Sequence, residues 1–138
     1  MSKYGSDDVT IQVDDSGGSL VDLSNYIDTI NDLAISADTQ ETHAFGDSWL
    51  EHLATGLKRM DDVTLEGFYD DTASTGPHVV LNGDGAALGA TRTLKVTIGG
   101  GKYVQCETII TKYTRKPNRG ELTRFTAVLR PTGAVTEA

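Results

Sequence analysis

The sequence predicts a mainly β protein, an antiparallel β-sandwich or flattened barrel with one short α-helix on its flank. Alternating apolar and polar residues fill most of the last third of the chain, which is the pattern of half-buried strands. Short turns rich in Gly and Pro join these segments, as in hairpins. One segment alone carries the signals of both helix ends. With 138 residues the chain is sized for a single domain, residues 1–138.

The first forty-five residues give the weakest strand pattern. Residues 10–13 read as a short strand that stops at the turn Asp14-Asp15-Ser16-Gly17-Gly18. The segment 20–35 mixes helical and strand spacing of its apolar residues, and we interpret most of it as bent strand. Residues 38–45 alternate weakly and end at a glycine.

The predicted helix begins at Ser48 and closes near Gly56. Ser48-Trp49-Leu50-Glu51 has the form of a capping box, in which hydroxyl and carboxylate satisfy the first backbone amides. Apolar side chains then recur every three to four residues, and Gly56 suits the left-handed turn that ends a helix. So short a helix is marginal alone, and we expect Trp49 and Leu53 to dock it onto the sheet.

The strands of the sheet follow this segment. Residues 63–69 and 93–98 alternate as amphipathic strands, and residues 103–113 and 122–129 continue the pattern across a turn at 115–120. The last three of these form a run of antiparallel hairpins. Residues 131–138 have little to bury, so we expect a loose tail.

Charge is unevenly distributed along the sequence. Residues 1–101 hold 17 acidic and 5 basic side chains, whereas residues 102–138 hold 3 acidic and 7 basic ones. If the two parts end on different faces of one fold, each copy presents complementary faces to the next, which favours head-to-tail association. Solvated charge without a partner is the alternative interpretation.

The sequence contains no strong motif for catalysis, cofactor binding or metal binding. The glycines of Val79–Gly89 resemble a dinucleotide-binding turn, but no helix fits between Gly85 and the next strand. The histidines, His43, His52 and His78, lack metal-ligand spacing, and the acidic doublets do not form a calcium-binding loop. Cys106, the only cysteine, falls within an alternating strand. We therefore predict no enzyme activity, no cofactor and no metal, and no apolar run is long enough for a membrane span.

The basic stretch 112–119 has two interpretations. Four positive charges and a tyrosine at a hairpin end could hold phosphate and stack a base. The rest of the chain is strongly acidic, and this favours a role as the positive side of a protein interface.

The order of these segments resembles the major tail tube proteins of long-tailed, siphovirus-type bacteriophages. The resemblance rests on Thr42-His43-Ala44-Phe45-Gly46-Asp47, on Glu66 to His78, and on a hairpin that ends in Leu129-Arg130-Pro131-Thr132-Gly133. It covers the chain from about residue 14 to residue 133. These are structural junctions and not catalytic signatures.

The resemblance implies a virion tail protein that is made and assembled in the cytoplasm of the host bacterium. Homo-hexameric rings would stack into a tube, with an inner barrel formed by strands of all six subunits and a long loop or hairpin reaching into the next ring. The partners would be further copies, a tape measure protein and other tail proteins. DNA would pass through without specific binding, along a negatively lined conduit.

Charge segregation suggests the residues of these surfaces. Asp28, Asp32, Asp38 and Glu41 are the candidates for a lumen or ring-contact face, and Arg115, Lys116 and Arg119 for the opposed basic face. The Gly- and Asp-rich stretch 70–90 looks able to order on contact. Two alternatives stay open: a related ring-forming component, such as a tail terminator, distal tail protein or secretion-tube ring, and a small β-sandwich module that binds nucleic acid or carbohydrate.

Overall fold

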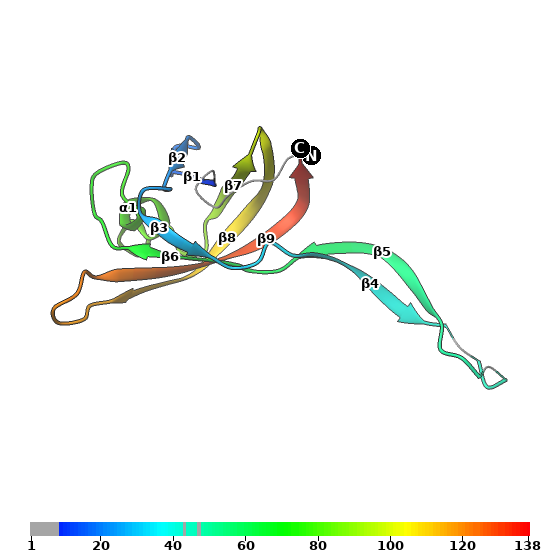
Figure 1. The fold of residues 1–138 in the computed structure, drawn as a ribbon. Coiled ribbons are helices and arrows are strands. Elements are labelled where there is room, and N and C mark those ends of the chain that lie inside the picture. The colour runs from blue at the N-terminus through cyan, green and yellow to red at the C-terminus, as the bar shows by residue number, and fades with distance from the viewer. Residues whose placement is uncertain (1–8, 43, 47) are drawn as a thin grey trace.

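The computed structural model describes residues 9–42, 44–46 and 48–138, and most of them lie in antiparallel strands (Figure 1). The elements in chain order are β1 (Thr10–Asp14), β2 (Leu20–Asp22), β3 (Ile27–Ile30), β4 (Ile35–Glu41), β5 (His52–Met60), β6 (Val63–Phe68), α1 (Pro77–Leu81), the 3₁₀ turn η2 (Gly83–Gly85), β7 (Thr91–Gly99), β8 (Lys102–Lys116) and β9 (Arg124–Glu137). The predicted class, mainly β and antiparallel with one short helix, is confirmed.

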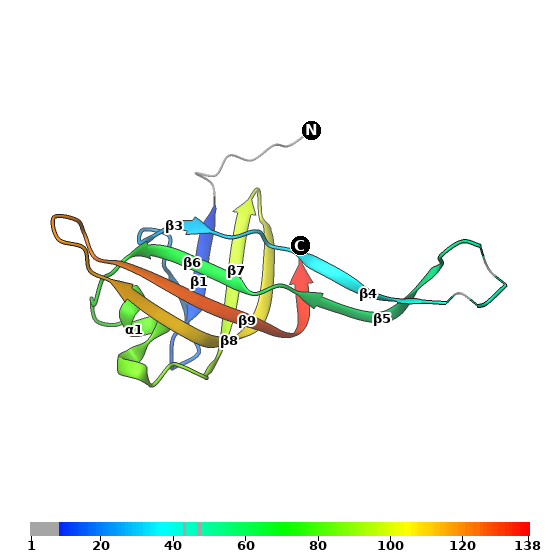
Figure 2. The same cartoon turned by 90° about the horizontal axis from the view of Figure 1, so that it is seen from below.

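Seven strands form one curled sheet in the order β2-β1-β7-β8-β9-β6-β3. Its two edge strands, β2 and β3, are consecutive in the chain and are joined by residues 23–26 alone. The five Cα–Cα steps from Asp22 to Ile27 span at most about 18 Å, so the end of β2 must lie close to the start of β3. The sheet is therefore a half-barrel that almost closes on itself (Figure 2).

The core lies on one face of this half-barrel. The fully buried side chains alternate along each central strand, as Leu94 and Val96 do on β7 and Phe125, Ala127 and Leu129 on β9. The helix α1 adds Val80 and Leu81 to the same core. Pro77 occupies the first turn of this helix, where its missing N–H is not needed.

Two predictions from the sequence are wrong. No helix forms at residues 48–57, because His52–Met60 is the strand β5, and the helix lies instead at Pro77–Leu81. The expected loose tail is ordered: β9 continues to Glu137, and residues 131–137 pair with β8, for example Val135 with Cys106. The tail is ordered because its backbone pairs with that of β8.

The strands β4 and β5 form a separate two-stranded ribbon that projects from the body (Figures 1 and 2). We call residues 35–60 the arm. Its root is tied to the body by hydrogen bonds: the Asn31 amide nitrogen donates to the carbonyl of Asp62, the Asn31 amide oxygen accepts from the amide of Thr64, and the Asp61 amide donates to the carbonyl of Ala34. The predicted bent strand at 20–35 is thus divided between β2, β3 and the start of the arm.

At one position of the sheet, Gly67, a neighbouring strand lies so close that only glycine fits. A Cβ at Gly67 on β6 would lie 1.9 Å from the carbonyl oxygen of Tyr26, just before β3. The Phe68 amide donates to the same carbonyl at 2.8 Å, and the pairing of β3 with β6 shifts register at this point. The edge strand can sit this close to β6 only because residue 67 has no side chain.

Candidate assembly surface

The arm exposes apolar side chains that are not covered by any other described part of the chain. Leu53 and Leu57 on β5 are each about two-thirds exposed, and Trp49, in the loop before β5, is 83% exposed. A two-stranded hairpin is at best marginally stable alone in water. Apolar side chains on a protruding ribbon are typical of a surface that is covered by a partner.

The arm is kinked by a bulge near its middle. Thr39 pairs with Ala54 and Ala37 with Lys58, so Asp38 faces the three residues 55–57. Gly56 has a φ of 86°, the left-handed conformation that glycine adopts without strain. The hydroxyl of Thr55 donates to the carbonyl of Asp38. Gly56, which was predicted to end a helix, therefore lies in a β-bulge of β5.

Trp49 and Leu53 do not dock a helix onto the sheet, which corrects the sequence prediction. Leu53 lies on β5 opposite Gln40, and both apolar side chains point into solvent from the arm. Their spacing fits one face of a helix equally well, but His52 and Leu53 begin β5 and pair with β4, and Trp49 lies in the loop before that strand.

A second projection lies on the opposite side of the body, where β8 and β9 extend beyond the sheet to a turn (Figures 1 and 2). We call residues 112–124 the basic tip. The structure brings Arg115, Lys116 and Arg119 together here, all of them exposed. Leu122, in the turn, is 72% exposed. The tip thus combines positive charge with an apolar contact.

The four predicted acidic residues do not form one face. Asp28 lies on β3 and Asp32 follows that strand, whereas Asp38 and Glu41 lie on β4 in the arm. Asp38 lies 3.9 Å from Arg59 on the neighbouring arm strand.

Two ion pairs join the acidic and basic parts of the sequence within one subunit. The Arg124 guanidinium donates to both carboxylate oxygens of Asp28, at 2.7 and 2.9 Å, and this contact holds the pKa of Asp28 below its ordinary value. Arg130 contacts Asp62 in the same two-pronged way, at 3.2 and 3.3 Å. Part of the charge asymmetry in the sequence is therefore neutralised inside the fold.

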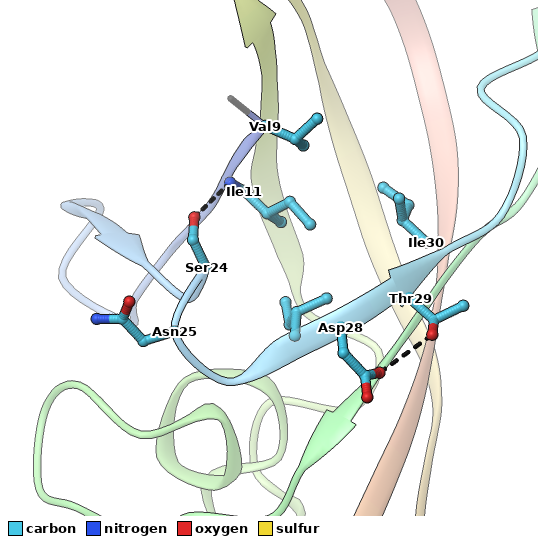
Figure 3. A pocket seen from close by; sticks show the side chains of 8 residues that line it. Val9, Ile11, Ser24, Asn25, Asp28, Thr29 and Ile30 are labelled. Carbon is cyan, nitrogen blue, oxygen red and sulfur yellow. Dashed lines mark hydrogen bonds between the residues drawn. The ribbon is translucent and has the colours of Figure 1, made fainter. Parts of the chain in front are cut away.

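A cleft opens between β1 and β3, where the two sides of the half-barrel approach each other (Figure 3). The Ile11 amide donates to the Ser24 hydroxyl at 2.8 Å, and the Thr29 hydroxyl donates to the Asp28 carboxylate at 3.1 Å. The lining is apolar on one side and polar on the other: Val9, Ile11, Ile27 and Ile30, then Ser24, Asn25, Asp28 and Thr29. Asp28, the one carboxylate among the described lining residues, is engaged by Arg124.

The residues weighed for chemistry are held in structural positions. Cys106 is buried, and burial raises the pKa of its thiol, which works against a reactive thiolate. His78 packs its ring 5.1 Å from that of Tyr69 and 5.7 Å from that of Tyr113. Burial raises the pKa of Tyr113 to about 12.

Metal binding and membrane spanning find no support in the described part of the chain. No group of three or more His, Cys, Asp or Glu side chains there could hold a metal ion. His43 lies outside the described residues. No helix within residues 9–42, 44–46 and 48–138 has the length and apolarity to cross a membrane.

Comparison with known proteins identifies the fold. No protein-family model and no curated protein matches the sequence. Several solved structures resemble it over nearly the whole length of both chains, among them the following three. One is a chain in the tail of an empty gene transfer agent particle refined with C6 symmetry (15% identity, 99% of each chain covered, TM-score 0.76).

The other two structures come from a virion and a baseplate. The first is a chain in the virion of a native gene transfer agent particle (15% identity, 99% of each chain, TM-score 0.73). The second is a chain in the six-fold symmetrised baseplate of an anti-feeding prophage (10% identity, 100% of this chain and 97% of the other, TM-score 0.74). The protein therefore has the fold of chains found in phage-like tail and baseplate particles.

Proposed function

We propose that this protein is a structural subunit of a phage-like tail, in which six copies close into a ring and the rings stack into a tube. The observation that carries the proposal is the fold match, which spans the chain from end to end. It involves chains of two kinds of particle, one refined with C6 symmetry and one symmetrised six-fold. The protein would act by assembly, without catalysis or a cofactor.

The arm supports assembly independently of the fold match. It leaves Trp49, Leu50 and Leu53 in solvent on a ribbon that cannot bury them against its own body. Covering these side chains with a second copy would remove apolar area from water at roughly 25 cal/mol per Å². In a ring or tube, every subunit would gain this contact.

The net charge of −8 supports a conduit for DNA. Carboxylates that line a bore repel phosphate, so a duplex would slide through without specific binding. Asp32 is exposed and free of the two ion pairs that engage Asp28 and Asp62, which makes it the better lumen candidate of the β3 region. A tape measure protein would occupy the same bore before DNA, and the whole would form part of a virion tail, of the siphovirus type in our proposal, assembled in the host cytoplasm.

A ring that does not extend into a tube is the second candidate. The match to a baseplate chain favours it, because that match is as complete as the matches to tail chains. The two candidates differ in what a ring accepts on its second face: another ring of the same protein, or a different component.

Electron microscopy of the purified protein distinguishes these functions. Samples across a wide range of concentration and ionic strength should contain stacked rings or tubes with six-fold end views. Isolated rings at all concentrations would support the second candidate. A persistent monomer, verified by sedimentation velocity, would contradict both. A variant in which a short Asn-Gly turn replaces residues 38–57, and so joins the paired residues Ala37 and Lys58, should fold as the body alone and remain monomeric.

A further inference from the structure

The two projections of the subunit carry opposite charge. Residues 38–51, which we call the arm tip, contain four acidic side chains and no Lys or Arg: Asp38, Glu41, Asp47 and Glu51. Asp47 lies outside the described residues, and Glu41 and Glu51 are exposed. Trp49 and Leu50 lie among these acids, also in solvent. The described part of the arm tip thus exposes the carboxylates of Glu41 and Glu51 together with the apolar side chains of Trp49 and Leu50.

The basic tip has the complementary composition. It holds five basic side chains and one acid, Glu121. Arg124 is engaged by Asp28, but Lys112, Arg115, Lys116 and Arg119 form no ion pair with an acid of the described chain. Leu122 supplies the apolar contact.

The two surfaces cannot meet within one subunit. They project from opposite sides of the body in both views (Figures 1 and 2), and β4 alone extends about 23 Å outward at 3.3 Å per residue. A contact between them must join different copies. Because the surfaces differ, the contact is heterologous, and it repeats from each copy to the next.

We infer that the arm tip of one subunit docks on the basic tip of a neighbouring subunit in the tail assembly, an inference that rests on the proposed function. Acidic side chains of the arm would face Arg115, Lys116 and Arg119, while Trp49 and Leu50 pack against Leu122 and the alkyl parts of the basic side chains. One contact would thereby cover the exposed apolar residues of the arm and the four cations of the basic tip that form no ion pair within the described chain.

Nucleic acid fits the basic tip less well. Four unpaired cations neutralise few phosphates, and the subunit as a whole carries a net charge of −8 that repels a polyanion. DNA binding would also leave the apolar residues of the arm uncovered. A second copy of the chain accounts for both projections, and DNA accounts for one.

Charge reversal tests the inference. The tip variant carries R115E and R119E, and the arm variant carries E41K and E51K. We expect each variant alone to raise the concentration needed for assembly about tenfold or more. An equimolar mixture should restore assembly to within about twofold of the wild type, since alternating copies place opposite charges at every junction. The variant K102E, on the β7–β8 hairpin, is the control and should assemble normally.

Several outcomes would overturn the docking contact while leaving the proposed function intact. These are normal assembly of both variants alone, or no rescue in the mixture although the wild type assembles. A tip variant that assembles normally but no longer retards duplex DNA at low salt would assign the basic tip to nucleic acid.

Cysteine cross-linking separates the contact from ring formation. Mixing E51C protein with R119C protein under mild oxidation should give a mixed disulfide dimer in high yield, and each variant alone should give far less. If this dimer forms while the wild type never forms rings or tubes, the contact stands and the proposed function fails. If neither forms, both are wrong.

Discussion

Replacing Trp49 by alanine should weaken assembly and leave the fold unchanged. Trp49 is 83% exposed, and a large aromatic side chain offers about 150–250 Å² to a partner. Covering most of that area corresponds to about 3–5 kcal/mol at ~25 cal/mol per Å². Buried area converts incompletely into affinity, so we expect a loss of about 2–3 kcal/mol for each contact. The assembly concentration should therefore rise roughly 30- to 150-fold.

The assay is sedimentation velocity across a concentration series, with electron microscopy of the same samples. Thermal unfolding of the dilute monomer should agree with the wild type, because the side chain touches little of its own chain. Leu88→Ala, at a 43% exposed apolar residue of the body, is the matched control and should assemble normally. Assembly of the tryptophan variant at the wild-type concentration, or a marked drop in its melting temperature, would refute the reasoning that the arm is covered by a partner.

Three further predictions concern the monomer. Gly67→Ala should destabilise it by about 3 kcal/mol or more in urea unfolding, because the new Cβ would lie 1.9 Å from a carbonyl oxygen, whereas Gly46→Ala, with nothing within 4 Å, should be neutral. Asp28→Asn should lower the melting temperature at pH 7. Since the pKa of Asp28 in the folded state is below its unfolded value of 3.8, the difference from wild type should shrink as the pH falls through the folded-state pKa and should be absent once both states are protonated. Deleting residues 131–138 should lower the melting temperature and promote aggregation, because it exposes an edge of β8; a deletion variant that melts with the full chain would show that this pairing adds nothing.

The strands of the central sheet were predictable because they bury one face within the chain. Leu94, Val96 and Ile110 are buried, and polar side chains alternate with them, so the period of the pattern reports the pairing directly. β7 and β8 contain the segments predicted for them, and β9 covers its predicted segment from Arg124 onward. Their lengths were underestimated, since β8 runs on to Lys116 in the basic tip and β9 runs on to Glu137 along β8.

The arm was not predictable by the same reasoning. The prediction of a helix at 48–57 assumed that Trp49 and Leu53 must be buried by their own chain, but both are exposed. When apolar residues are exposed in the monomer, their spacing does not report which secondary structure they belong to. The short helix at Pro77–Leu81 was missed because five residues are too few to show a helical period, and its Pro at the start was the one available signal.

Candidate surfaces were predictable only where the sequence keeps them together. Arg115, Lys116 and Arg119 flank one turn and therefore meet at one tip. Asp28 and Asp38 are ten positions apart but belong to different sheets. Asp28 forms an ion pair with Arg124, which is 96 positions away. Pairing over that distance depends on the order of strands, which no local pattern encodes.

The outer part of β8 is continuous with the middle of the half-barrel, and this has a mechanical consequence. The strand runs from Lys102 to Lys116; its first part pairs with β7, while β9, beside it, pairs with β6. A pull on the basic tip along the hairpin axis would slide β8 past β7 and β9 past β6. All rungs of those two ladders would then resist the tension simultaneously, instead of opening one after another as in a zipper. A filament joined through such tips would stretch little before its subunits themselves came apart.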